Sequence, residues 1–238
     1  ESNSSYNALQ VEINKRFSHN FSVQGAYTFA RSLDGASAYS LGAAVPNVFN
    51  LHSQWALSDF FSKNIASFSW LWDLPRLTDY NPLMRFAAGG WEADGLVTLN
   101  SGQPINVLTG ADNALSGTPN QRPNVVGNPV LSNSRTRAAE IQAWFNAAAF
   151  AAPAPGAYGD AGRNALLGPG AATVNLGLYK SFALPGREGL RLQFRCEFFN
   201  LFNNVNLSNP NATLGSSMGR ITSAQSARVI QFALKLLF

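Results

Sequence analysis

The chain has one cysteine, few charged residues and no long apolar run. The single cysteine, Cys196, excludes an internal disulfide and any metal site built from several cysteines. Charged residues make up 13% of the sequence, whereas an ordinary soluble domain has roughly 25%. No segment approaches the roughly 18 consecutive apolar residues of a membrane-spanning helix. This excludes a helical membrane span but leaves open a membrane-crossing β-sheet, whose strands never contain such runs.

Recognisable chemistry for catalysis or cofactor binding is also lacking. His19 and His52 fall in a predicted turn and a loop, with no cysteine nearby and no paired spacing, so we expect no zinc site and no catalytic base there. Cys196 alternates with Leu and Phe and is expected to be a small apolar residue, not a nucleophile. The net charge is only +4 and the basic residues are scattered, which predicts no nucleic-acid partner. We therefore expect a protein that is not an enzyme and carries no cofactor or metal.

The C-terminal residues show the clearest pattern in the chain. Side chains alternate from residue 228 to the end, with the two-residue period of a β-strand. One face is wholly apolar and ends in an aromatic residue; it consists of Ile230, Phe232, Leu234, Leu236 and Phe238. The other face carries Gln231 and Lys235. A strand with hydrocarbon on one side and a watery lumen on the other has this composition.

Six further segments alternate in the same way and are predicted as strands. They are residues 6–17, 21–33, 64–74, 88–100, 173–182 and 190–202. Residues 101–171 form the longest irregular stretch, and within it a short helix is expected over residues 135–148. Its apolar residues have helical spacing: Ile141, Trp144, Phe145 and Ala148.

The predicted fold is all-β: an antiparallel, up-and-down transmembrane β-barrel segment with long extracellular loops and a short helix in the longest loop. A barrel in lipid must close, because an open edge leaves backbone groups unpaired. About seven strands, an odd number, do not suit such closure. We therefore expect residues 1–238 to be the C-terminal part of one larger barrel domain.

Short and long connections alternate along the chain, as periplasmic turns and outer loops do in bacterial barrels. The shorter connections, residues 18–20, 75–87 and 184–189, would all lie on the periplasmic side. Aromatic residues flank these turns on the apolar faces: Phe17, Phe21, Trp72, Trp91 and Phe182. Such a girdle is typical of a membrane interface. The charged residues of the apolar faces occur near strand ends, where long side chains can reach water; they are Lys15, Arg31, Lys180 and Arg228.

The opposite faces carry charge freely, as the lumen wall of a barrel would. Five of these residues are candidates for contact with a plug or cargo: Glu92, Asp94, Arg191, Arg195 and Glu197. The arginines and Glu197 could instead pair with one another inside the barrel. The close spacing of Glu92 and Asp94 leaves open a cation site or a carboxylate pair like that of a glycosidase, although solvated lumen charge is the simpler interpretation.

Several short motifs occur in order along the chain. They are YNALQV (6–11), KRF (15–17), YTFARSLD (27–34), LSDF (57–60), GGW (89–91), SGQP (101–104), WFN (144–146), AF (149–150), GRN (162–164), GPG (168–170), EFFNLFN (197–203) and GRIT (219–222). Together with the terminal strand, they resemble the C-terminal barrel of TonB-dependent outer-membrane transporters, specifically the Oar-like branch. The resemblance implies a barrel of about 22 strands, occluded by an N-terminal plug, in the outer membrane of a Gram-negative bacterium.

Four partners follow from these expectations: outer-membrane lipid, the barrel assembly machinery that reads the terminal strand, the TonB complex acting through a plug outside this chain, and an unknown ligand at the extracellular loops. The corresponding function is ligand capture and TonB-energised uptake across the outer membrane. Two other classes stay open, an outer-membrane adhesin or surface-organising barrel without transport, and a secreted all-β binding module. A plug and TonB box upstream would separate the transporter from the adhesin, and extraction by salt would identify the secreted module.

Overall fold

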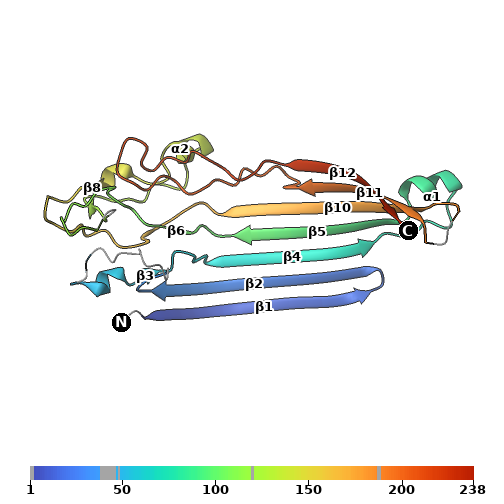
Figure 1. Cartoon of the computed structure of the whole chain (residues 1–238), viewed down its shortest axis with the longest axis horizontal. Coiled ribbons are helices and arrows are strands. Elements are labelled where there is room, and N and C mark those ends of the chain that lie inside the picture. Colours follow the sequence, from blue (N-terminus) through green and yellow to red (C-terminus); the bar gives the residue numbers. More distant parts are fainter. Residues whose placement is uncertain (1–2, 38–46, 48, 119–120, 187–188) are drawn as a thin grey trace.

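The computed structural model of the chain describes residues 3–37, 47, 49–118, 121–186 and 189–238. Its main element is one antiparallel sheet in which seven long strands lie side by side in chain order (Figure 1). They are β1 (Ser4–Ser18), β2 (Phe21–Asp34), β4 (Asn64–Asp73), β5 (Trp91–Asn100), β10 (Ala171–Ala183), β11 (Arg191–Phe199) and β12 (Val229–Leu237). A short strand, β3 (Ala56–Leu57), pairs with the end of β2. The predicted all-β antiparallel fold is therefore confirmed.

The strand register places the apolar positions of all seven long strands on one side of the sheet. Residues that pair directly in an antiparallel sheet project to the same face. One row of successive partners consists of Val23, Trp70, Gly95, Leu176, Phe198 and Ile230. A neighbouring row of the opposite side consists of Glu12, Ala26, Ser67, Thr98 and Thr173. We call these two sides the apolar face and the polar face.

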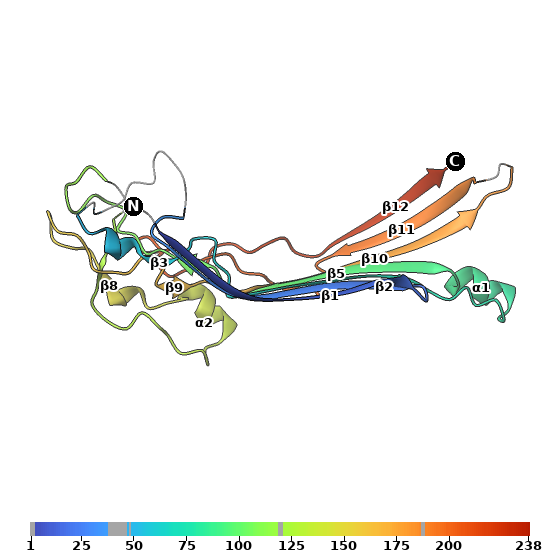
Figure 2. The same ribbon diagram turned by 90° about the horizontal axis from the view of Figure 1, so that it is seen from below.

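Along most of its length, the apolar face is not covered by any other described element. Large side chains on it are strongly exposed, including Leu9, Ile13, Phe232 and Leu234, the last two at 67% and 68%. Figure 2 shows the sheet edge-on, with the helices and irregular segments gathered at its two ends. No second sheet packs against the strands among the described residues. A contiguous exposed apolar surface of this kind marks a site of contact with a membrane or another apolar partner.

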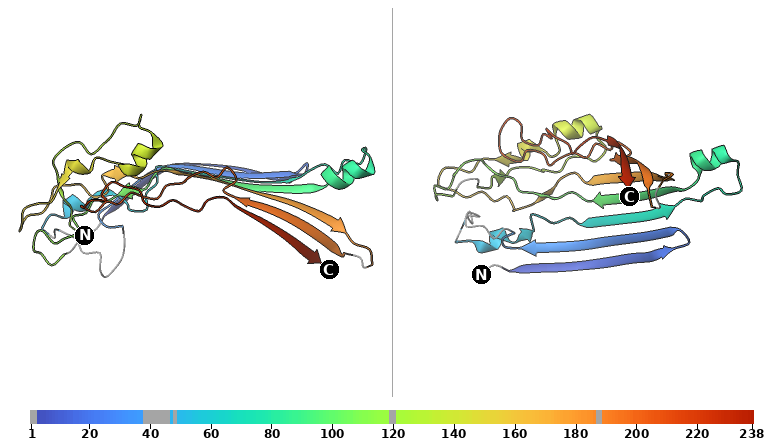
Figure 3. Two further views of the ribbon diagram at one scale, coloured as in Figure 1. Left: turned by 90° about the horizontal axis from the view of Figure 1, so that it is seen from above. Right: turned by 45° about the vertical axis from the view of Figure 1, so that its right-hand side comes forward.

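The sheet is an open, shallow arc. β1 and β12 are the first and last strands of the order, and no pairing joins them in the described part of the chain. Strands β1 to β5 lie almost in one layer, and β10 to β12 turn away from it (Figures 2 and 3). No helix among the described residues is long and apolar enough to cross a membrane.

At one end of the sheet, which we call the turn end, the connections between long strands are compact. The β1–β2 turn uses His19 and Asn20 at φ 53° and 62°, the left-handed geometry of a tight hairpin turn. In the β10–β11 connection, the amide of Leu184 donates to the carbonyl of Leu190 at 3.0 Å. Arg187 and Glu188 of the predicted turn over residues 184–189 lie outside the described residues.

The β4–β5 connection contains a helix that the sequence analysis did not predict, α1 (Pro82–Ala88). Asn81 caps it by accepting a hydrogen bond from the amide of Met84 at 2.8 Å, and Pro82 occupies the first turn, where its missing N–H costs nothing. The expected strand over residues 88–100 therefore begins only at Trp91, after Gly90 reverses the backbone with φ 67°.

The opposite end, which we call the loop end, is more ordered than expected. The 34–63 loop contains the 3-10 helix η1 (Leu51–Gln54). The 101–171 segment contains two small two-stranded sheets and two short helices. They are β6 (Pro104–Ile105) with β9 (Leu166–Leu167), β7 (Asn124–Val125) with β8 (Phe150–Ala151), α2 (Arg137–Gln142), and the 3-10 helix η2 (Ala147–Ala149). These elements are short, so most of the described part of residues 101–171 is irregular, as expected, and α2 lies within the range 135–148 where a short helix was expected.

The loop end has a hydrophobic core of its own. Its buried members are Ile105, Val107, Phe145, Ala149, Phe150, Ala161, Leu166 and Met218. The rings of Phe145 and Phe150 meet edge to face, with centroids 5.9 Å apart, a favourable geometry for aromatic pairs. Of the apolar stripe expected on one helix, Phe145 lies beyond the end of α2 and packs into this core. The loops thus form a compact cap beside the sheet.

Candidate functional site

A buried arginine of the 101–171 segment joins the loop cap to the strands. Arg163 is 8% exposed and pairs with the carboxylate of Asp34, the last residue of β2. It also donates to Asp59 Oδ1 at 3.2 Å and to the carbonyl of Gln54 at 3.0 Å. The next residue, Asn164, donates from its side chain to the carbonyl of Leu57 at 2.7 Å. Together with the backbone pairing of β3 with β2, these contacts hold the 51–59 region against the end of β2.

We call Arg163, Asn164, Asp34 and Asp59 the loop clamp. The buried half of the clamp is the Arg163–Asp34 pair, because the side chain of Asp34 is only 6% exposed, whereas that of Asp59 is 59% exposed. A buried ion pair must be well hydrogen-bonded to offset the cost of removing its charges from water. Here Ser37 supplies further bonds to the Asp34 carboxylate, with oxygen–oxygen distances of 3.0 and 2.8 Å.

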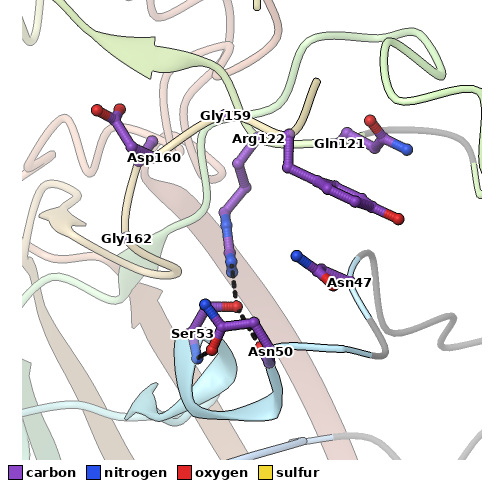
Figure 4. Close-up of a pocket in the computed structure, with 10 residues that line it drawn as sticks. Asn47, Asn50, Ser53, Gln121, Arg122, Gly159, Asp160 and Gly162 are labelled. Carbon is purple, nitrogen blue, oxygen red and sulfur yellow. Dashed lines mark hydrogen bonds between the residues drawn. The ribbon is translucent and has the colours of Figure 1, made fainter. Parts of the chain in front are cut away.

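A second buried arginine lies beside the clamp and borders a cavity of about 390 Å³ (Figure 4). Arg122 is 7% exposed and donates to Ser53 Oγ at 3.2 Å and to Gln54 Oε1 at 3.3 Å. No carboxylate of the described residues forms an ion pair with it. Burial lowers the pKa of Arg122, and the nearby charge of Arg163 lowers it further. The guanidinium is thus a buried cation held by neutral oxygen atoms.

Several of the other residues that line the cavity have polar side chains held in place by hydrogen bonds. Gln121 is fully buried, and its amide donates to Asp112 Oδ1 at 2.7 Å and to Ser116 Oγ at 2.9 Å. Asn50 caps η1, and Asp160 accepts from the amide of Val125 at 2.7 Å. The lining is completed by Asn47, Tyr158, Gly159, Ala161 and Gly162. Such a cavity can bind a polar ligand through amide, hydroxyl and guanidinium groups, and the described residues place no nucleophile beside a base in it.

The five charged candidates of the polar face lie on β5 and β11, on either side of β10. Direct pairing brings Glu92, Tyr179 and Arg195 into one row. Asp94, Gly177 and Glu197 form the next row. Arg195 and Glu197 form an ion pair at 2.7 Å, and the Arg195 guanidinium lies 4.7 Å from the centre of the Tyr179 ring. Mutual pairing within the sheet, left open above, therefore occurs for Arg195 and Glu197.

The other charged candidates of the polar face form no ion pair with one another in the described part of the chain. Asp94 Oδ1 is buried without a hydrogen-bond partner among the described residues. Arg191 starts β11 opposite Ala183 and Leu237 and borders a shallow pocket with Asp73 and Glu92. The described residues contain no cluster of three or more His, Cys, Asp or Glu side chains that could hold a metal ion.

The five predicted girdle aromatics are all close to the turn end. Phe17 and Phe21 flank the β1–β2 turn, and Phe21 is opposite Trp72. Trp91 is opposite Lys180, and Phe182 is opposite Leu192. Of the terminal residues, Ile230, Phe232, Leu234 and Leu236 pair with the apolar side of β11, and Phe238 follows β12 with 88% of its surface exposed.

Sequence reasoning missed α1, Arg122 and the loop clamp. The helix did leave a signal, because Asn81 before Pro82 is a typical N-cap and first-turn pair. Arg163 and Asn164 stood within a recognised motif, but nothing around them in the sequence indicated their partners. Arg163 lies 129 positions from Asp34, and no local pattern reports a contact over that separation.

Comparison with known proteins identifies a family. A family model described as an outer membrane beta barrel domain matches residues 1–231. No curated protein and no solved structure matches the chain.

Proposed function

Since the chain belongs to the outer membrane beta barrel domain family, and so to the outer membrane, we propose that it forms part of the wall and the outer loops of a TonB-dependent transporter. The apolar face then contacts hydrocarbon and the polar face lines the lumen. Short turns of such barrels face the periplasm and longer loops face outward. The turn end is therefore periplasmic, and the loop end, with its clamp and polar cavity, is extracellular.

The observation that supports a transporter is the openness of the sheet. The diameter of a barrel grows with its strand number, and about eight strands give an interior that side chains fill. In so small a barrel, the seven long strands would curl almost into a closed ring. Instead β1 and β12 are the unpaired ends of a shallow arc in the described chain (Figure 3). Large barrels of about 22 strands have a lumen wide enough for a plug.

The loop end suits ligand capture. Its cavity combines a buried guanidinium with amide and hydroxyl groups, and such convergent polar groups fix the orientation of a bound molecule. The clamp holds one wall of this cavity to the sheet, because Arg163 binds the carbonyl of Gln54 and Arg122 binds its side chain. A wall that is already ordered loses less conformational freedom when a ligand binds.

Binding of the periplasmic domain of TonB tests this proposal. The full-length protein, extracted in detergent, should bind that domain saturably and lose binding when the segment before its plug is removed. A bacterial strain that lacks TonB should also fail to import the ligand, although the ligand should still bind at the cell surface. Absence of TonB binding would instead favour the alternative, an adhesin or surface-organising barrel. Release of the protein from membranes by salt alone would contradict both and favour a secreted module.

A further inference from the structure

Helix α1 lies at the turn end, on the apolar side of the sheet. Its Phe86 ring packs on Phe182 with a centroid distance of 5.4 Å. The indole N–H of Trp91 donates to the carbonyl of Ala87 at 2.9 Å. Phe182 and Trp91 both belong to the apolar face, through their pairing with Leu192 and Lys180. These contacts hold α1 as a continuation of the apolar face beyond the strands.

Lys180 reinforces this attachment. Its ammonium group donates to the carbonyl of Gly89, which ends α1, at 2.5 Å. It also lies 5.5 to 5.9 Å from the ring centres of Trp91, Phe182 and Phe86. A cation is favourable at the C-terminus of a helix and over aromatic rings. Lys180 is therefore buried at 6% exposure instead of reaching freely into water, as was expected for charges of the apolar face.

The outer surface of α1 is apolar and uncovered in the described residues. Leu83 is 76% exposed and Phe86 is 65% exposed. They are three positions apart, so they share one side of the helix. Arg85 projects to the other side, because two positions correspond to more than half a turn. A short, largely apolar helix whose one charged residue, Arg85, lies away from Leu83 and Phe86, next to the apolar face of the sheet, has the pattern of an interfacial segment.

We propose that α1 lies in the phospholipid interface of the periplasmic leaflet, with Leu83 and Phe86 in the acyl-chain boundary and Arg85 toward the headgroups and water. The inference rests on the proposed orientation of the barrel wall. Its evidence is the continuity of α1 with the apolar face through Phe182 and Trp91. The partner is a lipid surface and not a periplasmic protein.

Site-directed spin labelling of the full-length protein in phosphatidylethanolamine–phosphatidylglycerol vesicles tests this inference. Nitroxide labels are placed singly by Leu83→Cys and Arg85→Cys, with Leu234→Cys as the reference on the apolar face. The background is Cys196→Ala; because Cys196 is buried, it can be retained if its replacement impairs folding. Accessibility to oxygen reports hydrocarbon, and accessibility to a water-soluble nickel chelate reports water.

We expect the label at residue 83 to resemble the one at 234, with high oxygen accessibility and nickel accessibility several-fold lower than at residue 85. Equal nickel accessibility at 83 and 85 would overturn the inference while leaving the wall intact. Protection of residue 83 from both reagents would overturn it by showing that α1 is covered by protein, within the full-length chain or by a second copy. High nickel accessibility at 234 would show that the apolar face itself does not meet lipid, so the proposed function would fail as well.

Discussion

Replacing Arg163 with methionine should release the 51–59 region from the sheet. Methionine keeps much of the apolar length of the side chain but removes the charge and all of its hydrogen bonds. The carboxylate of Asp34 then remains buried without its cationic partner, although Ser37 still donates to it. Removing one partner of a buried ion pair costs about 3–5 kcal/mol. The contact with the exposed carboxylate of Asp59 adds less than about 1 kcal/mol.

A loss at the lower end of this range, about 3 kcal/mol, corresponds to roughly a hundredfold change in a local opening equilibrium. Backbone amides report such openings through hydrogen exchange. The amide of Ser58 donates to the carbonyl of Ser32 at 3.1 Å, and that of Phe61 donates to the carbonyl of Ser58 at 2.9 Å. Both should exchange about a hundredfold faster in Arg163→Met, measured by mass spectrometry in detergent micelles. The amide of Gly89, at the other end of the sheet, should be unchanged.

Arg195→Met is the matched control, because it removes an arginine from an ion pair whose side chains are 33% and 20% exposed. Such a pair contributes about 0–1 kcal/mol, so amides near it should change less than about fivefold. Asp34→Asn combined with Arg163→Met should recover part of the loss, since contacting residues are not additive. If Ser58 and Phe61 exchanged in Arg163→Met as in the unaltered protein, the clamp would not be what holds the region.

Three further predictions concern the strands. Val97→Arg places a charge on the apolar face in mid-sheet, which costs about 2–4 kcal/mol in lipid. The yield of membrane-inserted protein should therefore fall for this variant, whereas Gln193→Arg on the polar face should insert normally. Equal yields would contradict the assignment of the faces. Deleting Phe238 should slow insertion, measured as delayed heat-modifiable migration on gels, and an unchanged time course would refute its part in assembly. A Cβ atom added at residue 95 would lie 2.1 Å from the ring of Trp70. Gly95→Val should therefore displace the ring and lower the free energy of unfolding, measured in denaturant, by about 1–3 kcal/mol. A stability equal to that of the unaltered protein would show that the ring moves aside at no cost.

The strands could be predicted because their signal is local. Alternation assigns each residue to a face without knowledge of its partners, and a short turn then fixes the register of the next strand. In the β1–β2 pair the turn sets Ser18 opposite Phe21, but an irregularity between Lys15 and Ser18 then shifts the register, so that Ile13 lies opposite Gly25. Alternation predicted the faces of this pair, and the shift was not predicted. The end of β11 was less predictable. The alternation suggests a strand to residue 202, but Asn200 at φ 54° ends it at Phe199.

The loop end could not be predicted because its structure depends on contacts between distant residues. Arg163 contacts Asp34 across 129 positions and Asp59 across 104. Arg122 reaches Gln54 across 68. Each of these side chains appears in the sequence as an ordinary charged or polar loop residue. Burial of a charge is favourable only when its charged and hydrogen-bonding partners are all in place. These partners come from distant segments, so the sequence pattern of one segment does not predict them.

This difference between the two ends follows from their surroundings. Within a bilayer, every backbone group of a strand must be paired by its neighbours. The wall is therefore built from regular strands, whose local pattern can be predicted from the sequence. Water surrounds the loops, where irregular backbone is permitted and the order must come from side chains. The buried pairs of Arg163 with Asp34 and of Arg122 with Ser53 and Gln54 supply that order. Both arginines contact Gln54. Arg122 therefore contacts the same 51–59 region that the clamp holds against β2. A ligand bound at the cavity would therefore contact a segment that the clamp ties to β2.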